Sequence, residues 1–330
     1  MKIIFDLRQV GLGDNGGSLT LIKCANTLFN LGHEVIIIDT GRNQHSWTKL
    51  NTPHLICNSN DKIPDADVII ATGYKSVPLT CSAPKRCGIK LHYIRGWETW
   101  QYPEQQIYEK ILKTPTIKIV NSICLKNKLK QYKVDSTIIR PGYDLEDLYP
   151  MNIRNKKSSF VLGGLYTKGK HEKIKRTQWI FDTAKYFKNK YPNVKLIMFG
   201  NSELKNNLVD EYYYKPSMQN KNKFFNLVDV WLAPVMQEGL HMPPAEAMLT
   251  GCPVVATNAE MSGTQDYVIS GVTGIVTKNN INSFIEGVDS LYQNAGIRKD
   301  IGILAREKIL ELGSREENMK KFINFLESIK

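Results

Sequence analysis

The sequence predicts an α/β fold built from two parallel-sheet domains. Short runs of β-branched residues alternate with longer segments of helical periodicity, which is typical of parallel sheets covered by helices. A strand, a glycine-rich turn and a helix open the chain, and the same order returns after residue 159. A length of 330 residues also suits two domains of ordinary size.

The first domain is expected to span residues 1–150. Its glycine-rich turn over residues 11–17 leads into a helix at 18–31, in which leucine and isoleucine recur on one side. Strands are expected at residues 2–5, 34–39, 68–71, 91–94 and 117–120, and a turn at 140–142 closes this half.

The second domain is expected to span residues 151–330, with a polar, basic linker at 151–159. A second glycine turn is predicted at Gly163-Gly164, followed by a helix over about residues 171–190. Strands are expected at 160–162, 194–199, 230–233 and 253–256, a short helix at 243–249, and mostly helix from about 281, where the last helices could cross back to the first domain. Ligands of such sheets bind at the carboxyl ends of the strands, so the two Rossmann-like domains are expected to face one another across a cleft.

The composition indicates a cytoplasmic protein. Hydrophobic residues make up 42% of the chain, which is enough for two cores. No run reaches the roughly 18 apolar residues of a membrane-spanning helix, and the N-terminus lacks the longer apolar segment of a secretory signal. The six cysteines are scattered, without the paired spacing of a zinc site, so reduced thiols are expected.

The net charge of +12 does not by itself indicate nucleic-acid binding. Basic residues are spread over both halves and no nucleic-acid recognition motif accompanies them, so no nucleic-acid partner is expected. Residues 110–140 and 154–176 are richer in lysine and arginine. Such runs are most often solvated faces. The alternatives are an anionic membrane surface for the first run and phosphate groups for the second.

The first glycine loop supports two functional interpretations. Gly11, Gly13 and Gly16 match the dinucleotide fingerprint G-x-G-x-x-G, and Asp39 follows at about the distance of a ribose-binding acid, which would make the chain an NAD-dependent oxidoreductase. Polar residues interrupt the preceding strand, however, and Gly17 extends the loop. Gly16 and Gly17 would let backbone amides approach a sugar or phosphate closely, which we favour over nicotinamide binding or a simple turn.

Two acids lie eight positions apart in the segment 233–248. Glu238 is expected in a loop after a buried strand, and Glu246 near the start of a helix that begins at Pro243-Pro244, where a missing N–H is harmless. Carboxylates so placed suit hydrogen bonds to vicinal hydroxyls of a sugar or ribose. The plainer interpretations are a solvated loop acid and an acid that complements the helix dipole.

This segment resembles the E-x7-E region of retaining glycosyltransferases of family 4, which have the GT-B fold of two Rossmann-like domains. The resemblance continues through Gly251-Cys252-Pro253-Val254-Val255 and residues 271–276, and more weakly through residues 16–17, 31–35 and 140–144. It implies that Glu238 contacts donor-sugar hydroxyls and that Glu246 binds the nucleotide ribose. The backbone amides implied to hold the sugar or phosphates are those of Gly239, Leu240 and His241.

The sequence departs from the family at two places. A glycine is usual where His241 stands, so this side chain is expected to narrow or repolarise the sugar pocket. The family's diphosphate-binding pattern of Gly-Arg and Lys-Gly appears here as Gly164, Lys168 and Lys170 in a run without arginine. The resemblance implies that Lys168 stabilises the leaving diphosphate, while Lys170, or else Lys175 or Arg176, supplies the second charge.

In the first domain, Arg95 and Glu98 follow a predicted strand and are expected to face the cleft. Many relatives carry a histidine near there that reaches the transferred sugar, and in register Arg95 rather than His92 takes that place. Arg95 and Glu98 are therefore candidate acceptor-cleft residues, with packing or surface roles as the alternative.

These features predict a retaining glycosyltransferase that moves a sugar from a nucleoside-diphosphate sugar to a glycan, lipid or other hydroxyl acceptor. The N-terminal domain would bind the acceptor and the C-terminal domain the donor, with Glu238, Lys168 and Arg95 as catalytic residues. No covalent nucleophile is evident, so same-face displacement is favoured. No metal or other cofactor is implied. The alternatives are the oxidoreductase and a non-catalytic protein that binds sugars or a membrane surface. The expected location is cytoplasmic, with peripheral membrane contact through residues 110–133.

Overall fold

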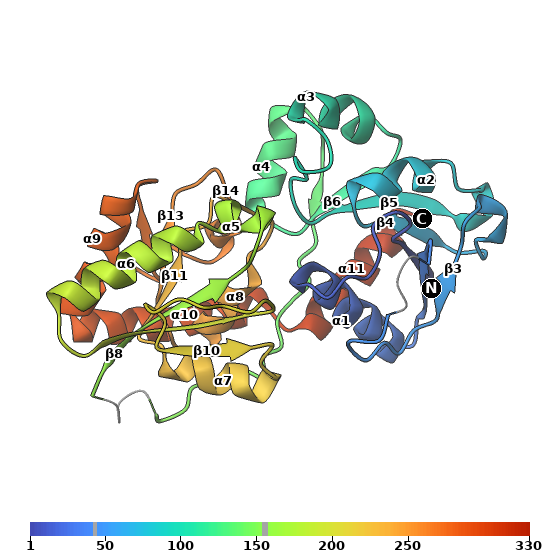
Figure 1. Ribbon diagram of the computed structural model, residues 1–330. Helices are drawn as coiled ribbons and strands as arrows, with labels where there is room; N and C mark the ends of the chain where they lie inside the picture. The colour runs from blue at the N-terminus through green and yellow to red at the C-terminus, as the bar shows by residue number, and fades with distance from the viewer. Residues whose placement is uncertain (42–44, 154–157) are drawn as a thin grey trace. The chain divides into compact units, whose positions relative to one another are not determined.

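The computed structural model of the chain describes residues 1–41, 45–153 and 158–330. The chain divides into two compact units. Unit 1 comprises Met1–Gly142 with Arg315–Lys330, and unit 2 comprises Tyr143–Ser314. Each unit is built on a parallel β-sheet flanked by helices (Figure 1).

Unit 1 forms a doubly wound sheet. Its strands are β1 (Lys2–Asp6), β2 (Glu34–Asp39), β3 (His54–Ile56), β4 (Val68–Ala71), β5 (Ile89–Ile94), β6 (Ile117–Val120) and β7 (Thr137–Ile138), and its helices are α1 (Gly16–Asn30), α2 (Val77–Cys81), α3 (Glu104–Ile107), α4 (Ile123–Gln131) and α11 (Arg315–Ser328). A π-helical turn, Tyr108–Leu112, follows α3. The strand order is β3-β2-β1-β4-β5-β6-β7, so the order reverses between β1 and β4 as in a Rossmann fold.

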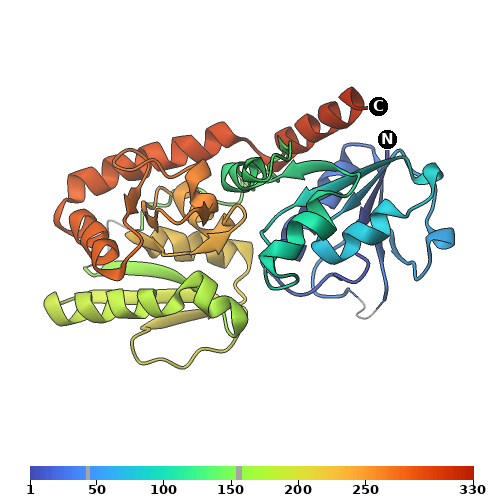
Figure 2. The same ribbon diagram turned by 90° about the horizontal axis from the view of Figure 1, so that it is seen from above.

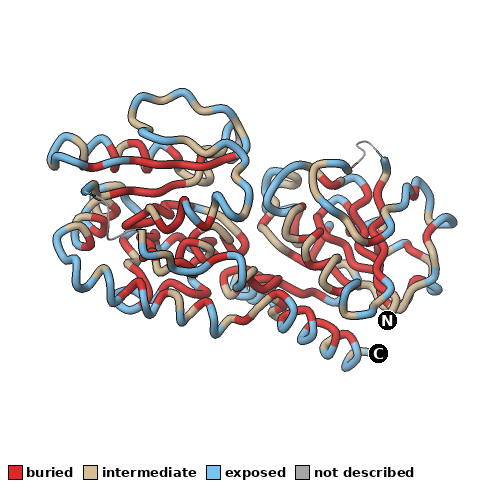
Figure 3. Tube along the Cα trace, turned by 90° about the horizontal axis from the view of Figure 1, so that it is seen from below, coloured by how far each residue is buried: buried red, intermediate tan, exposed pale blue. Residues whose placement is uncertain are grey.

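Helical layers bury both faces of this sheet. Ile3 and Phe5 of β1 belong to a core that includes side chains of α1 and α11, whereas Ile4 belongs to a separate core on the other face. This explains why β1 is apolar without alternation. Buried residues, drawn in red in Figure 3, run through the middle of the unit.

The C-terminal helix α11 completes unit 1. Its Phe322 and Leu326 are buried in the core that includes α1, and Arg315 at its start donates through Nη1 to the carbonyl oxygen of Pro141 at 3.1 Å. The carboxylate of Asp67 accepts hydrogen bonds from the backbone N–H of Lys2 at 2.7 Å and from Nζ of Lys330 at 2.8 Å. Figure 2 shows both chain ends on this unit.

Unit 2 repeats the doubly wound plan. Its strands are β8 (Phe160–Tyr166), β9 (Val194–Gly200), β10 (Glu211–Tyr214), β11 (Val230–Ala233), β13 (Val254–Thr257) and β15 (Ile275–Thr277), in the order β10-β9-β8-β11-β13-β15. Its helices are α5 (Lys170–Lys175), α6 (Thr177–Lys190), α7 (Met218–Leu227), α8 (Met242–Leu249), α9 (Ile281–Gln293) and α10 (Ala295–Leu312). Two further strands, β12 (Gln237–Glu238) and β14 (Met261–Ser262), pair with each other beside the main sheet.

The division of the structure differs from the expected boundary at residue 150. The chain leaves unit 1 after Gly142 and returns at Arg315, because Tyr143 and Leu148 already pack in the core of unit 2 and α11 packs on α1. The expected linker at 151–159 falls within unit 2, and its residues 154–157 lie outside the described residues. The expectation that the last helices return to the first domain matches α11, and the expected cleft stays a prediction.

The turn predicted at Gly163-Gly164 is wrong, because both glycines lie inside β8. A Cβ atom at Gly163 would lie 2.6 Å from the side chain of Val228, and one at Gly164 would lie 3.0 Å from that of Ile180. The glycines therefore let neighbouring elements pack closely on both faces of the strand.

The single helix predicted over about residues 171–190 is also wrong. Arg176 takes a left-handed conformation with φ 51° and separates α5 from α6. Its guanidinium lies 4.3 Å from the ring centroid of Trp179, and its Nη1 donates to the carbonyl oxygen of Pro234 at 3.3 Å. These contacts stabilise a break that helix propensity does not indicate.

Candidate functional site

The candidate donor-site residues of unit 2 follow the carboxyl ends of two adjacent strands. The strand order reverses between β8 and β11, and ligands of doubly wound sheets bind at such a point. Lys168 lies just after β8, and Glu238 lies on β12, a few residues after β11. Helix α5 is held beside this segment, because the backbone N–H of Met236 donates to the carbonyl oxygen of Ile174 at 2.9 Å.

Glu238 forms an ion pair with Lys175. The pairing of β12 with β14 holds the backbone of Glu238, and α5 ends at Lys175, whose Nζ contacts Oε1 of Glu238. The side chains of Lys175 and Glu238 are 15% and 27% exposed, respectively. Such partial burial strengthens the pair relative to a surface pair, while the carboxylate still meets solvent. From the sequence, Lys175 was expected only as a possible source of charge, and its contact with Glu238 was not predicted.

The backbone between Glu238 and α8 makes a turn that is held from two sides. His241 has φ 55° and ψ 69°, a conformation uncommon outside glycine, and the hydroxyl of Tyr267 donates to its carbonyl oxygen at 2.6 Å. Gly263 lets the segment after β14 come close, because a Cβ there would lie 2.2 Å from the carbonyl oxygen of Gly239 and 2.6 Å from the carbonyl carbon of Leu240.

The imidazole of His241 is buried at this turn. The residue is 5% exposed, and within the described part of the chain its Nδ1 has no hydrogen-bond partner. Burial and, to a smaller extent, the charge of Lys175 lower the pKa of His241 to about 3, although Glu238 acts in the opposite direction. The ring is therefore neutral at ordinary pH and lies within the electrostatic reach of the Glu238–Lys175 pair.

Glu246 forms a second ion pair, with Lys221 of α7. Nζ of Lys221 lies 2.6 Å from Oε2 of Glu246, and the side chains of Lys221 and Glu246 are 14% and 12% exposed. The lysine also lies over the ring of Phe199, 5.4 Å from its centroid. Lys221 could not be predicted from the sequence, because its partner comes from α8 and no local spacing relates the two residues.

The expected phosphate-binding residues lie in β8, at the start of α5 and in the connection between the two. Lys168 is exposed in the short connection between β8 and α5. Lys170 begins α5, but its side chain lies outside the described part of the structure. Gly164 is buried within β8. The donor contacts expected of these three residues stay predictions.

In unit 1, Arg95 connects the start of α1 to the end of β4. Its Nη1 donates to the carbonyl oxygen of Gly17 at 2.6 Å, and its Nη2 donates to that of Thr72 at 3.2 Å. Gly16 and Gly17 form the exposed first turn of α1, which Asn15 caps by accepting from the backbone N–H of Ser18 at 3.0 Å. The structure thus brings Arg95 and Gly17 together.

Glu98 supports the backbone of the same unit. Its Oε2 accepts a hydrogen bond from the backbone N–H of Tyr74 at 3.0 Å. Burial raises the pKa of Glu98, although this hydrogen bond and the nearby Arg95 act against the shift. A carboxylate held in this way keeps the loop after β4 in place, and any contact with an acceptor stays a prediction.

Asp39, the acid of the dinucleotide interpretation, interacts with its own loop. Its Oδ1 accepts from the backbone N–H of Thr40 at 2.5 Å and of Gly41 at 3.4 Å, and its Oδ2 lies 3.6 Å from Nε2 of His54. Burial alone would raise the pKa of Asp39, but these hydrogen bonds outweigh it and lower the pKa. The carboxylate is therefore already committed within the loop, which weakens the oxidoreductase interpretation.

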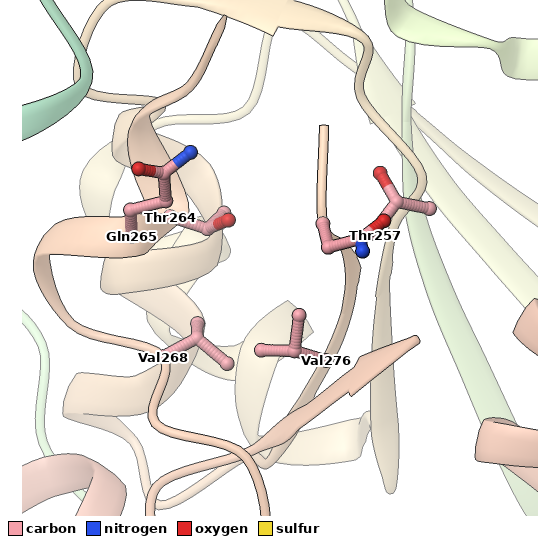
Figure 4. A pocket seen from close by; sticks show the side chains of 6 residues that line it. Thr257, Thr264, Gln265, Val268 and Val276 are labelled. Carbon is pink, nitrogen blue, oxygen red and sulfur yellow. The ribbon is translucent and has the colours of Figure 1, made fainter. Parts of the chain in front are cut away.

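A cavity of about 240 Å³ lies in unit 2, lined by residues from the end of β13, from the turn after β14 and from β15 (Figure 4). Its wall includes Thr264, whose hydroxyl lies 2.7 Å from that of Ser262, the residue paired with Glu238 across β12 and β14. The cavity is smaller than the roughly 300–1,000 Å³ of common ligand sites, so by itself it is too small to enclose a nucleotide sugar. Its lining residues are Thr257, Asn258, Thr264, Gln265, Val268 and Val276.

The described residues lack two kinds of site. They contain no group of three or more His, Cys, Asp or Glu side chains placed to hold a metal ion. None of the helices they form is long and apolar enough to cross a membrane.

In the basic stretch 110–133, Lys113 pairs with Glu109 and Lys128 with Glu104, each at 2.8 Å.

Comparison with known proteins identifies the region that carries Glu238. Residues 163–294 match the family described as "Glycosyl transferases group 1". This region is a glycosyltransferase domain. The domain includes both ion-paired acids and most of unit 2, so the enzyme class fits glycosyl transfer rather than the oxidoreductase alternative.

Curated relatives agree with this assignment. The capsular polysaccharide biosynthesis glycosyltransferase CapM of Staphylococcus aureus is 29% identical over 163 residues, which cover 46% of this chain and 41% of that protein. The chain spans less than half the length of the curated relatives it matches.

Solved GT-B structures show the same fold over the whole chain. Sucrose-phosphate synthase from Thermosynechococcus elongatus has a TM-score of 0.80 at 14% identity, covering 100% of this chain and 99% of its own. Anabaena HepE in complex with UDP and glucose has a TM-score of 0.79 at 16% identity, covering 99% and 100%. The predicted fold of two Rossmann-like domains is therefore confirmed.

Proposed function

We propose that the chain is a retaining glycosyltransferase of the family-4 type that takes its sugar from a nucleoside-diphosphate sugar. The observation that carries the proposal is Glu238, held on β12 after the central strand β11, in contact with Lys175 and next to the turn that begins α8. A carboxylate at this edge of a doubly wound sheet is placed for a ligand with hydroxyl groups.

The two ion pairs suggest how a donor would be held. Hydroxyls of the sugar would donate hydrogen bonds to the carboxylate of Glu238, which would release Lys175 to turn toward the diphosphate. Lys175 and the exposed Lys168 would then supply the two positive charges that the departing diphosphate requires. Glu246, positioned by Lys221, would bind the hydroxyls of the nucleotide ribose.

The proposed reaction is a same-face displacement without a protein nucleophile. The acceptor oxygen forms a bond to the anomeric carbon, the bond from that carbon to the diphosphate oxygen breaks, and the departing phosphate takes the acceptor proton. We propose that neither a metal ion nor another cofactor takes part. Proton NMR of the first product formed would show the anomeric configuration of the donor; the opposite configuration would contradict the retaining mechanism.

A UDP-sugar is the first donor to test, because HepE has been solved in complex with UDP and glucose. We assign the acceptor to unit 1 and propose a glycan or lipid-linked hydroxyl, reached near Arg95, Glu98 and the Gly16-Gly17 turn. Exposed lysines of the stretch 110–133 would bring the enzyme to an anionic membrane from the cytoplasmic side. Transfer to the same acceptor, offered either free in solution or in anionic vesicles, would show whether the enzyme acts on soluble or on membrane-bound acceptors.

The test of the proposed function is Glu238→Gln. We expect its kcat for transfer, or for slow hydrolysis of UDP-glucose, to fall by about 100-fold, because a neutral amide no longer complements the hydroxyls and the developing charge. Glu286→Gln, which changes an exposed acid of α9 in the same unit, is the matched control and should keep wild-type turnover. Wild-type turnover in a folded Glu238→Gln protein would contradict the proposal.

A further inference from the structure

His241 combines two features that are unfavourable for the stability of the fold. Its backbone is in the left-handed region, where a residue with a side chain is strained. Its imidazole is buried, and among the described residues nothing donates to or accepts from Nδ1. Both features are costly, and glycine at this position would remove both.

The surroundings of the ring indicate what it could bind. His241 follows Glu238 by three residues on the turn that begins α8, and the electrostatic influence of Glu238 and Lys175 reaches its ring. The imidazole thus lies on the turn that directly follows the strand of the carboxylate assigned to sugar hydroxyls. A ligand with a hydrogen-bonding group would supply the partner that the ring nitrogen of His241 lacks.

The charge state of the ring narrows the ligand class. A neutral imidazole offers one N–H donor and one acceptor nitrogen, which matches an uncharged hydroxyl better than a phosphate oxygen. Lys168 and Lys175 already supply positive charge near the carboxyl ends of β8 and β11. His241 is therefore not required to stabilise the charge of the diphosphate. The sugar portion of the donor is therefore the part that the ring would meet.

We propose that His241 is a specificity-determining residue for the donor, whose imidazole forms a hydrogen bond with a hydroxyl of the transferred hexose. This rests on the proposed function and goes beyond it by assigning sugar recognition to one side chain. That side chain fills space that glycine would leave open, so it selects the sugar both by hydrogen bonding and by size.

The experiment compares the binding of UDP-glucose and of UDP by calorimetry, because the ratio of the two affinities isolates the sugar. His241→Gly keeps the backbone amide and relieves the strained φ, so the variant should fold. We expect its affinity for UDP-glucose to fall by about 5- to 15-fold relative to wild type while its affinity for UDP stays within about twofold.

Two further variants separate recognition from backbone strain. His241→Asn tolerates the left-handed conformation and carries a donor and an acceptor, so it should recover part of the lost ratio. Asn193→Gly relieves a similar backbone, with φ 63°, at an exposed position of the same unit and should leave the ratio unchanged.

The outcomes distinguish this inference from the proposed function. An unchanged ratio in folded His241→Gly, with Glu238→Gln inactive, overturns the role of His241 and leaves the glycosyltransferase standing. A wild-type protein that binds both ligands but transfers no sugar overturns the proposed function, and the binding ratio still decides the role of the ring.

Discussion

At the scale of single residues, some buried polar side chains have hydrogen-bond partners and others have none among the described residues. In β1 and just beyond it, Arg8 donates through Nε and Nη2 to the two carboxylate oxygens of Asp6 at 2.9 and 2.6 Å, and both residues are buried. These are the polar residues that interrupted the predicted first strand, and they satisfy each other. In contrast, His92 is fully buried in β5, and neither ring nitrogen has a hydrogen-bond partner among the described residues.

This difference predicts that His92 limits stability in acid. Burial, with a smaller contribution from the charge of Lys118, lowers the pKa of His92 from 6.5 to about 3. The unfolded chain therefore binds the proton more readily, and stability is lost as the pH falls from about 6.5 toward 3. We expect His92→Leu to lose less stability than wild type over this range in urea unfolding, and to be about 0–1 kcal/mol more stable at pH 7.5. An equal loss in both proteins would show that other groups set the acid limit.

At the scale of elements, close backbone approach positions the site. The turn at residues 239–241 is held because Gly263 follows β14 without a side chain. Gly163 and Gly164 allow a similar close approach inside β8, where the side chains of Val228 and Ile180 pack against their backbone. The role of such glycines depends on the partner element, so a glycine pair in the sequence suits a turn and a packed strand equally well.

We predict that Gly263→Ala weakens donor binding more than it weakens the fold. The new Cβ would lie 2.2 Å from the carbonyl oxygen of Gly239, so the turn must move away. We expect the Kd for UDP-glucose to rise by about tenfold or more, with a loss of about 1–3 kcal/mol in the free energy of unfolding.

The matched control for this prediction is Gly296→Ala in α10. No atom lies within 4 Å of a Cβ built there, and alanine favours a helix, so stability should rise by up to about 1 kcal/mol and binding should not change. Unchanged affinity in Gly263→Ala would show that the turn does not contribute to the donor site.

At the scale of the whole molecule, two separate sets of cores predict two unfolding transitions. Phe322 of α11 is buried in unit 1, and Phe284 of α9 is buried in unit 2. Each phenylalanine replaced by alanine should cost its own unit about 3–5 kcal/mol. In calorimetry, Phe322→Ala should lower one transition and Phe284→Ala the other. If both variants lowered the same single transition, the units would not unfold separately.

Much of the fold follows from local sequence. The periodic apolar segments placed most strands within a residue or two, and the prolines placed the start of α8, because these signals depend on neighbours along the chain. Glu238 and Glu246 could be predicted as site residues for the same reason, since their spacing and flanking residues form one continuous segment.

What the tertiary structure alone decided are the relationships between distant residues. Lys175 reaches Glu238 from the far end of α5 and Lys221 reaches Glu246 from α7, and α11 joins a unit whose other residues end at Gly142. Such contacts depend on how helices pack on the sheets, and no residue pattern within one segment encodes the partner that folding brings to it.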